Sequence, residues 1–375
     1  MAEQKQQGAG ATTADVAPVS VVCHTLGDFQ RNPTLLREYA DPHGYVRCCD
    51  ADWLQMVASN PYMREDDLLL ILTLTDKTIV GRLGLHPGLA HYLDQNERTY
   101  WLDGFFLEPS YLNTGAGGRM LLAAISFSPS LLACGAPSTN LQKVYRATGF
   151  VELGPLTRYV YFYNPEVIAK KLLNTGRMPG ILSPLARLGS PLLRAYYKVH
   201  GRSAQAKLRF TPSSAFQRSL DALFDDVGLN FFPRDHKILN WALQHQEDAF
   251  GFEVWRGETL AGYCILKQRV QAEVPAHHLP EMSVGTLLDY WLDAESQMHQ
   301  DDLVQFCIDF FQKRNVDVLE IQASDPKLWR NCARLGMIAL GGNRVFFRPG
   351  SRKQPLPLSG WFLTHGTADV LLTGR

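Results

Sequence analysis

A glycine-rich stretch, Thr114–Gly118, is the part of the sequence best suited to bind a charged ligand. It follows an apolar and aromatic run, Tyr100–Leu107, that predicts a buried strand, which Pro109 would end because proline lacks a ladder donor. It precedes a helix-forming segment that begins at Met120. Glycines ahead of a helix let the backbone approach a ligand closely, and the free N–H groups of the first turn attract anions. The stretch therefore predicts a phosphate- or pyrophosphate-binding turn; the alternative explanation is tight packing alone.

The elements that must position this turn form a mixed pattern in the first 165 residues. Strands are predicted at 19–25, 68–74, 78–85, 100–107 and 130–135, and as a final pair within 151–163. Helices are predicted at 52–57, after the glycine turn, and over 138–146. Short apolar runs between turn residues indicate strands, whereas apolar residues three or four apart indicate helices. This order predicts a mixed α/β domain.

The pattern restarts at Ala215 and predicts a second domain of similar build. Its helices are expected at 216–224, 235–243, 301–314 and 328–334, and its strands at 252–255, 260–268, 286–292, 316–322 and 344–348. The strand at 286–292 matches Tyr100–Leu107 down to an acid in its middle, Asp289 against Asp103. An internal repeat of this size indicates two related domains. We expect a flexible tail (1–18), a first domain (19–165), a connector (166–214), a second domain (215–350) and a C-terminal tail (351–375) in which residues 360–364 dock on the body.

Composition excludes several classes of protein. The 375 residues carry 37 basic and 37 acidic side chains, so nothing in the net charge favours nucleic acid as a partner. The seven cysteines are scattered without a Cys-x-x-Cys pair, which fits a reducing compartment, and we expect a cytoplasmic protein. No apolar run is long enough for a transmembrane helix. His277 and His278 beside Glu281 fit no standard metal spacing, and no metal is expected.

The segment 167–200, within the connector, is basic and contains no acidic residue. Leucines and isoleucines lie between its positive charges, so one interpretation is an amphipathic segment that touches a membrane surface. The other interpretation, which we favour, is a connector whose apolar side packs across both domains. Pro179, Pro184 and Pro191 support it because they prevent one long helix.

Two short motifs resemble those of the GCN5-related N-acetyltransferases (GNAT). Leu112–Gly117 (LNTGAG) resembles the Gln/Arg-x-x-Gly-x-Gly/Ala turn that holds the pyrophosphate of acetyl-CoA, except that Leu112 replaces the family's Gln or Arg. Val144–Phe150 (VYRATGF) resembles the family's Leu-Tyr-x-x-x-Gly-Phe pattern, and the spacing leaves room for one helix and one strand. The resemblance implies two GNAT-like domains, each a mixed central sheet flanked by helices, and acetyl-CoA or another acyl-CoA as co-substrate.

The resemblance implies that the glycine turn and the end of the preceding strand hold this co-substrate. Backbone N–H groups near Phe106 and Leu107 would orient it and polarise the thioester carbonyl, while the turn would hold the pyrophosphate. The implied cofactor-binding residues are Phe106, Leu107, Asn113, Thr114, Gly115, Ala116, Gly117, Gly118 and Arg119.

The resemblance also implies direct acyl transfer to an amine in a ternary complex. Tyr145 would protonate the leaving thiolate, since a phenol has an ordinary pKa of about 10; the alternative is a tyrosine packed beneath the cofactor. Because the amine must lose a proton, a base is needed. The candidates are Asp103 in the strand and Glu108 at its end, followed by His86. A structural, hydrogen-bonded carboxylate is the alternative for Asp103.

The second domain lacks these features. Its segment Ala294–His299 contains no glycine, and Glu295 would repel a pyrophosphate. Cys332 stands at the position that matches Tyr145. We infer that this degenerate copy does not bind acetyl-CoA in the usual way, and that it completes the acceptor pocket or holds the fold.

Two functions follow from the resemblance. The first is an N-acyltransferase that moves an acetyl or other short acyl group to a primary amine of a small molecule or amino sugar. The second is a non-catalytic CoA-binding or scaffolding protein, which Leu112 favours, whereas Gly115, Gly117 and Tyr145 favour the enzyme. A Fem-type peptidyltransferase that uses charged tRNA fits less well, because the net charge is neutral and the turn is of the CoA type. The acceptor and the oligomeric state are left open.

Overall fold

The computed structural model describes most of the residues of the chain. The described ranges are 18–35, 51–75, 78–92, 95–112, 114–135, 139–163, 206–224, 230–232, 234–246, 248–271, 281–350 and 361–367. Asn113, residues 1–17 of the expected tail, residues 166–205 of the expected connector, and His277 with His278 lie outside them.

The first half of the chain, residues 20–162, places the predicted elements in the predicted order. It contains β1 (Ser20–Thr25), α1 (Leu26–Arg31), α3 (Ala51–Ala58), β2 (Leu68–Thr75), β3 (Thr78–Tyr92), β4 (Gln95–Leu107), η1 (Pro109–Tyr111), α4 (Ala116–Phe127), β5 (Leu131–Gly135), α5 (Thr139–Ala147) and β6 (Val151–Phe162). The strands β3 and β4 extend beyond the predicted limits because they pair with each other up to Tyr92 and Gln95.

The second half, residues 209–348, repeats this order, and a C-terminal segment follows it. It contains β7 (Arg209–Ser213), η3 (Arg218–Phe224), β8 (Asn230–Phe231), α8 (His236–His245), β9 (Ala249–Arg256), β10 (Thr259–Gln271), β11 (Met282–Leu292), η4 (Ser296–His299), α9 (Gln300–Gln312), β12 (Val318–Ala323), α10 (Pro326–Arg334) and β13 (Ile338–Arg348). The C-terminal segment contains β14 (Trp361–Phe362) and η5 (His365–Thr367). Strand β7 lies within the expected connector and pairs with β9.

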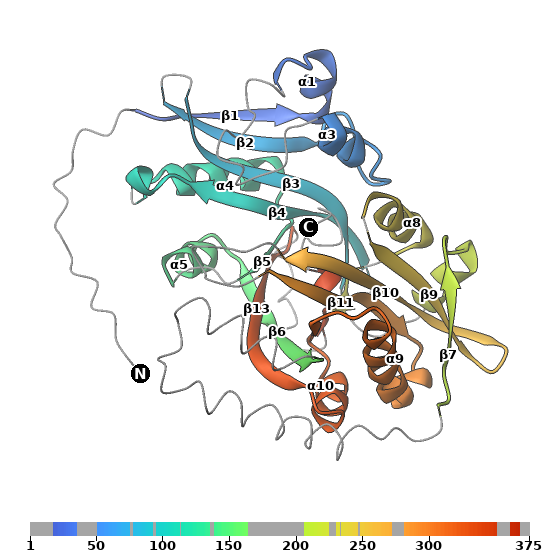
Figure 1. Ribbon diagram of the computed structural model, residues 1–375. Helices are drawn as coiled ribbons and strands as arrows, with labels where there is room; N and C mark the ends of the chain where they lie inside the picture. Colours follow the sequence, from blue (N-terminus) through green and yellow to red (C-terminus); the bar gives the residue numbers. More distant parts are fainter. Residues whose placement is uncertain are drawn as a thin grey trace, which may run out of the picture.

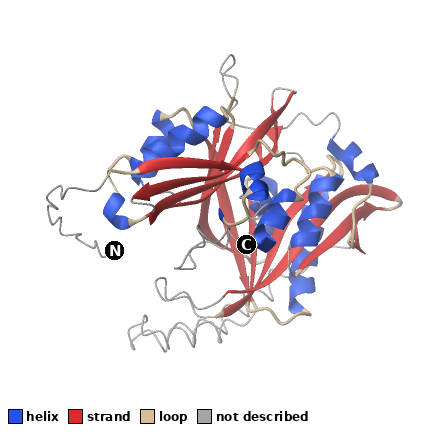
Figure 2. Ribbon diagram, turned by 90° about the horizontal axis from the view of Figure 1, so that it is seen from above, coloured by secondary structure: helices blue, strands red, loops and turns tan. Residues whose placement is uncertain are grey.

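All of these strands belong to one mixed sheet, which confirms the predicted α/β fold with a central sheet flanked by helices. Its main order is β1-β2-β3-β4-β5-β13-β6-β12-β11-β10-β9-β7. The strands of both halves continue into one another in a strongly bent sheet (Figure 2). Helix α4 packs on β1, β2 and β3, α9 packs on β12, and α10 packs on β6 and β13 (Figure 1).

The two halves exchange their last strands. Strand β13 of the second half lies between β5 and β6 of the first, and β6 pairs on its other side with β12 (Figure 1). The predicted pair of strands within 151–163 is therefore wrong, since β6 is a single strand. Within this strand, Gly154 takes a positive φ of 137° beside a shift in the pairing register with β13.

Three apolar clusters hold these layers together. One lies under α4 and includes Met120, Leu121 and Ala124, which are fully buried. A second lies under α9 and α10. The third lies on the other face of the sheet and joins both halves, through Trp101 of the first half and Trp291 of the second. Helices α4, α9 and α10 thus cover the first two clusters, whereas α8 packs into the shared core on the opposite face. Helices α1 and α3 pack on β2 in a further cluster.

Candidate active site

The N-terminus of α4 lies at the end of β4. The helix begins at Ala116, earlier than the predicted Met120, so Gly117 and Gly118 belong to its first turn. Gly115 is the N-cap residue, with a φ of 80°, and no side chain caps the helix. Since the first N–H groups of a helix have no partner within it, those of this turn point out of its open end. This geometry suits a phosphate group.

The three glycines of the turn are present for different reasons. Gly115 needs its positive φ, which L-residues rarely adopt. A Cβ on Gly117 would lie 3.2 Å from Cζ of Phe105, so packing limits this position. A Cβ on Gly118 would meet nothing within 4 Å. Packing therefore does not explain Gly118, which leaves room for a ligand to approach the backbone.

The remaining predicted residues of the turn are polar or exposed. Thr114 donates from Oγ1 to the Tyr111 carbonyl at 2.8 Å and accepts from Ala116 N at 3.4 Å, which steadies the loop. Arg119 is exposed and donates to the Val19 carbonyl at 3.2 Å. Leu112 is 55% exposed.

Strand β4 bulges and then separates from β5. The register with β3 shifts between Arg82 and Gly84, and Gly104 has a φ of 57°, which together mark the bulge. The parallel pairing of β4 with β5 ends at Leu102 opposite Ala133, although β4 continues to Leu107. Beyond that point β4 presents backbone groups to a widening gap between two strands. A glycine inside the predicted strand was the sequence signal for this bulge.

The two predicted backbone donors at the end of β4 face opposite ways. Glu108 N donates to the Val80 carbonyl at 2.9 Å, and because N–H direction alternates along a strand, Phe106 N–H also points toward β3. Leu107 N–H then points to the side on which β4 leaves β5. Its side chain lies beside the glycine turn, with Cδ2 3.7 Å from a Cβ placed on Gly117.

Tyr145 of α5 lies on the β5 side of the gap. Its ring packs against Phe150 at 4.9 Å and against Phe346 of β13 at 5.4 Å between centroids. Burial, and to a smaller extent the neighbouring Cys134 of β5, raise the pKa of Tyr145 to about 12. Because Cys134 follows the last paired residue of β5, the phenol lies near the point where the strands separate. Sequence reasoning did not find Phe346, because its strand comes from the other half of the chain.

Asp103 and His86, which were separate candidates, are brought together. Asp103 Oδ2 lies 3.4 Å from His86 Nε2, and both side chains are 2% exposed. Asp103 lies opposite Gly84, so alternation places Arg82, His86 and Asp103 on one face of the sheet, opposite α4. Arg82 is also buried and was not a candidate from sequence. Glu108 lies apart from this group, half-buried at the N-cap of η1.

The corresponding gap in the second half is filled by the C-terminal segment. The pairing of β11 with β12 ends at Leu287 opposite Ile321, and residues 361–367 lie beyond it. Thr364 bridges to Ala323, and Ser324 N donates to the Leu363 carbonyl at 2.9 Å. The predicted docking of residues 360–364 thus occurs, for the described residues 361–364, between the diverging strands β11 and β12.

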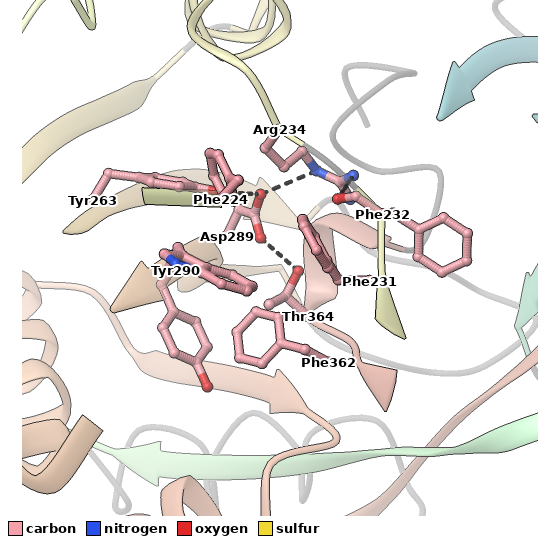
Figure 3. A pocket seen from close by; sticks show the side chains of 10 residues that line it. Phe224, Phe231, Phe232, Arg234, Tyr263, Asp289, Tyr290, Phe362 and Thr364 are labelled. Atoms are coloured by element: carbon pink, nitrogen blue, oxygen red, sulfur yellow. Dashed lines mark hydrogen bonds and ion pairs between the residues drawn. The ribbon is translucent and has the colours of Figure 1, made fainter. Parts of the chain in front are cut away.

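Asp289 is the centre of the network that holds this segment (Figure 3). It accepts from Thr364 Oγ1 at 2.6 Å and from the Tyr263 hydroxyl at 3.1 Å, and Arg234 Nε lies 3.2 Å away. The group borders a cavity of about 10 Å³ ringed by aromatic side chains, with room for about one water molecule. Asp289 lies after the bulge of β11, whereas Asp103 lies before that of β4. The two acids are therefore not equivalent, contrary to the sequence match.

His365 gives the attachment of this segment a pH dependence. Burial, followed by the nearby charges of Arg269, Lys267 and Arg158, lowers its pKa to about 3. A lowered pKa means that the folded state binds the proton less tightly than the unfolded state, so stability falls as pH drops from 6.5 toward 3. At pH 5 the loss is about 2 kcal/mol relative to neutral pH.

Urea unfolding at pH 7 and pH 5 checks this expectation. Wild type should lose about 2 kcal/mol more than His365→Gln over that interval, whatever the absolute stability of the variant. Equal losses would contradict the assignment.

The chain is similar to known proteins in its structure and not in its sequence. No protein-family model and no curated protein matches the chain. A GCN5-related N-acetyltransferase from Anabaena variabilis superposes with a TM-score of 0.51 at 13% identity, covering 88% of this chain and 72% of that one. N-myristoyltransferase of Saccharomyces cerevisiae with bound myristoyl-CoA superposes with a TM-score of 0.52 at 10% identity, covering 93% and 89%.

A probable N-acyltransferase from Enterococcus faecalis gives a TM-score of 0.51 at 9% identity, covering 89% of this chain and 73% of that one. The chain therefore has the fold of the GCN5-related N-acetyltransferases, as the two motifs predicted. At these sequence identities, the likeness shows the fold alone.

Within the described ranges, no helix is long and apolar enough to cross a membrane, and no group of three potential metal ligands occurs.

Proposed function

We propose that the protein is an acyl-CoA-dependent N-acyltransferase whose site lies in the first half. The observation that carries this proposal is the open N-terminus of α4 beside the gap between β4 and β5. A pyrophosphate on the first turn of α4 and a thioester in the gap would use two sets of backbone donors that the fold leaves available. Gly118, which packing does not require, supports a ligand at this place.

The co-substrate would be acetyl-CoA or another short acyl-CoA. Gly115 and Ala116 shape the turn, and the N–H groups of Gly117 and Gly118 would bind the pyrophosphate, with Thr114, Asn113 and Arg119 at its border. Leu107 N–H would point at the thioester carbonyl, while Phe106 would hold β4 against β3. The bound thioester supplies the activated acyl group, and the transfer requires no metal ion.

The acceptor in this proposal is a primary amine of a small molecule or amino sugar. Its nitrogen forms a bond to the thioester carbon as the carbon–sulfur bond breaks, and its proton passes to a base. The buried pair Asp103 and His86 is the better placed base, because it lies beside the bulge of β4; Glu108 is the alternative. Tyr145 would donate a hydrogen bond to the sulfur that leaves.

Calorimetry and a thiol-release assay test the proposal together. We expect acetyl-CoA to bind with a stoichiometry of one per chain, because the equivalent gap of the second half is filled. We expect free CoA thiol to appear with at least one member of a panel of primary amines and amino sugars. Failure of both acetyl-CoA and longer acyl-CoAs to bind would refute the site.

The alternative function is non-catalytic CoA binding by a scaffolding protein. Exposed Leu112, in place of a polar residue at the turn, favours it. Saturable CoA binding without thiol release across the amine panel would support this alternative.

A further inference from the structure

A second polar site lies on the sheet of the second half, away from the gap between β4 and β5. Its floor is a row of neighbouring residues: Lys267 of β10 pairs with Thr286 of β11, which lies beside Glu320 of β12. Arg158 of β6 and Arg269 of β10 flank this row and face the same side. The site borders the core shared by the two halves, which contains Leu156 of β6 and Ile265 of β10.

The site carries an excess of positive charge. Glu320 is shared by two arginines at long distances, 3.5 Å to Arg158 Nη1 and 3.6 Å to Arg269 Nη2. Lys267 adds a third cation and is 6% exposed. Two arginines therefore share one carboxylate in this cluster. Their side chains are 40% and 39% exposed, so a soluble anion can reach them from outside.

Several buried donors in the site have no hydrogen-bond partner in the described part of the chain. They are Nε of Arg158, Nε of Arg269 and Oγ1 of Thr286, whose residue is 3% exposed. Buried polar groups are nearly always paired, so donors clustered in this way indicate a bound acceptor. A water molecule could satisfy one or two of them but brings no negative charge.

His365 of η5 is a further buried group near the cluster. It is 6% exposed, and its Nδ1 also has no hydrogen-bond partner among those residues. After burial, the charges of Arg269, Lys267 and Arg158 lower its pKa further, which places the imidazole near this cluster. The docked C-terminal segment thus completes an enclosure that is positive and rich in donors.

We propose that this enclosure is a binding site for an oxyanion, a carboxylate or a phosphate group. Its several oxygens would accept from Arg158, Arg269 and Thr286, and its charge would balance the positive charge that remains when two arginines share Glu320. Charge-assisted hydrogen bonds of this kind are among the stronger ones in proteins. The site is distinct from the turn of α4 and does not depend on the proposed acyl transfer.

Calorimetric titration with inorganic phosphate and, separately, with sodium acetate tests the proposal at constant ionic strength. The full chain should be used with Gly118→Glu present, so that the turn of α4 does not contribute. We expect saturable binding of at least one anion, and the two titrations separate a phosphate ligand from a carboxylate ligand. Arg269→Gln should weaken this binding about tenfold or more, because it removes a charged donor.

Two further variants keep the result interpretable. Glu320→Gln removes the competing carboxylate and should strengthen anion binding, whereas a purely structural ion-pair network predicts no gain. Arg334→Gln removes an arginine whose partner is Asp301 on the outer helices, and should leave anion binding unchanged. No saturable binding of either anion, or equal binding by wild type and Arg269→Gln, would overturn the proposal.

Discussion

Replacing Gly118 by glutamate is expected to lower the affinity for acetyl-CoA about 10- to 100-fold, since each charge-assisted hydrogen bond lost is worth about 1.5–3 kcal/mol. The new side chain would occupy the open space in front of the first turn of α4. Its carboxylate would also repel a pyrophosphate there. Both effects act on the ligand and neither requires the fold to change.

Gly118 is a better target than the other glycines of the turn. A side chain at Gly115 would be strained by the φ of 80°, and one at Gly117 would press on Phe105. Loss of binding by either variant would thus be confounded by loss of structure. At Gly118 a glutamate in the first helical turn is favourable to the helix dipole, so the thermal stability should be equal or slightly higher.

Leu122→Glu is the matched control. Leu122 lies one turn along the same face of α4 and is 55% exposed, so it receives the same charge away from the helix end. Calorimetry should show wild-type affinity for this variant. Tight binding of acetyl-CoA by Gly118→Glu would mean that the ligand site lies elsewhere.

The order of helices and strands could be predicted because each of them depends on residues that are close together in the sequence. An apolar run of eight residues between turn residues, such as Leu68–Thr75, indicates a buried strand. Asp235 caps α8 by accepting from Ile238 N, as expected for an acid before a helix. The glycine turn was found for the same reason, since its conformation depends on neighbours in the sequence. Residue types and their spacing are therefore enough to predict the strand, the helix cap and the glycine turn.

Partners across the sheet could not be predicted in this way. The buried end of β13 is a short apolar run that would be compatible with many neighbouring strands. Nothing in its residues indicates that it pairs with β5 and β6 in the other half. The contact of Phe346 with Tyr145, the pairing of Asp103 with His86, and the place of Thr364 beside Asp289 all depend on such choices. These contacts depend on the packing of the whole chain, so they cannot be predicted from the local periodicity of the sequence.

Tyr145→Phe is expected to lower kcat about 10- to 100-fold while the KM for acyl-CoA changes little, as for the loss of a hydrogen bond to a charged atom. Phenylalanine keeps the packing on Phe150 and Phe346, so the thermal stability should stay close to that of wild type. Tyr159→Phe is the control, because it removes a phenol from β6 next to Cys332 and away from the proposed site. Unchanged kcat in Tyr145→Phe would remove Tyr145 from the mechanism.

The raised pKa of Tyr145 decides what kind of help the phenol can give. With a pKa of about 12, it is a weaker acid than a thiol of pKa about 8.5, so full proton transfer to the thiolate is uphill by about 5 kcal/mol. A hydrogen bond held through the bond-breaking step is therefore favoured over protonation. The phenol loses its proton only as pH rises through about 12, so the ratio of wild-type to Tyr145→Phe kcat should be constant between pH 7 and 10. A ratio that falls within this range would show that Tyr145 titrates there and acts as a true proton donor.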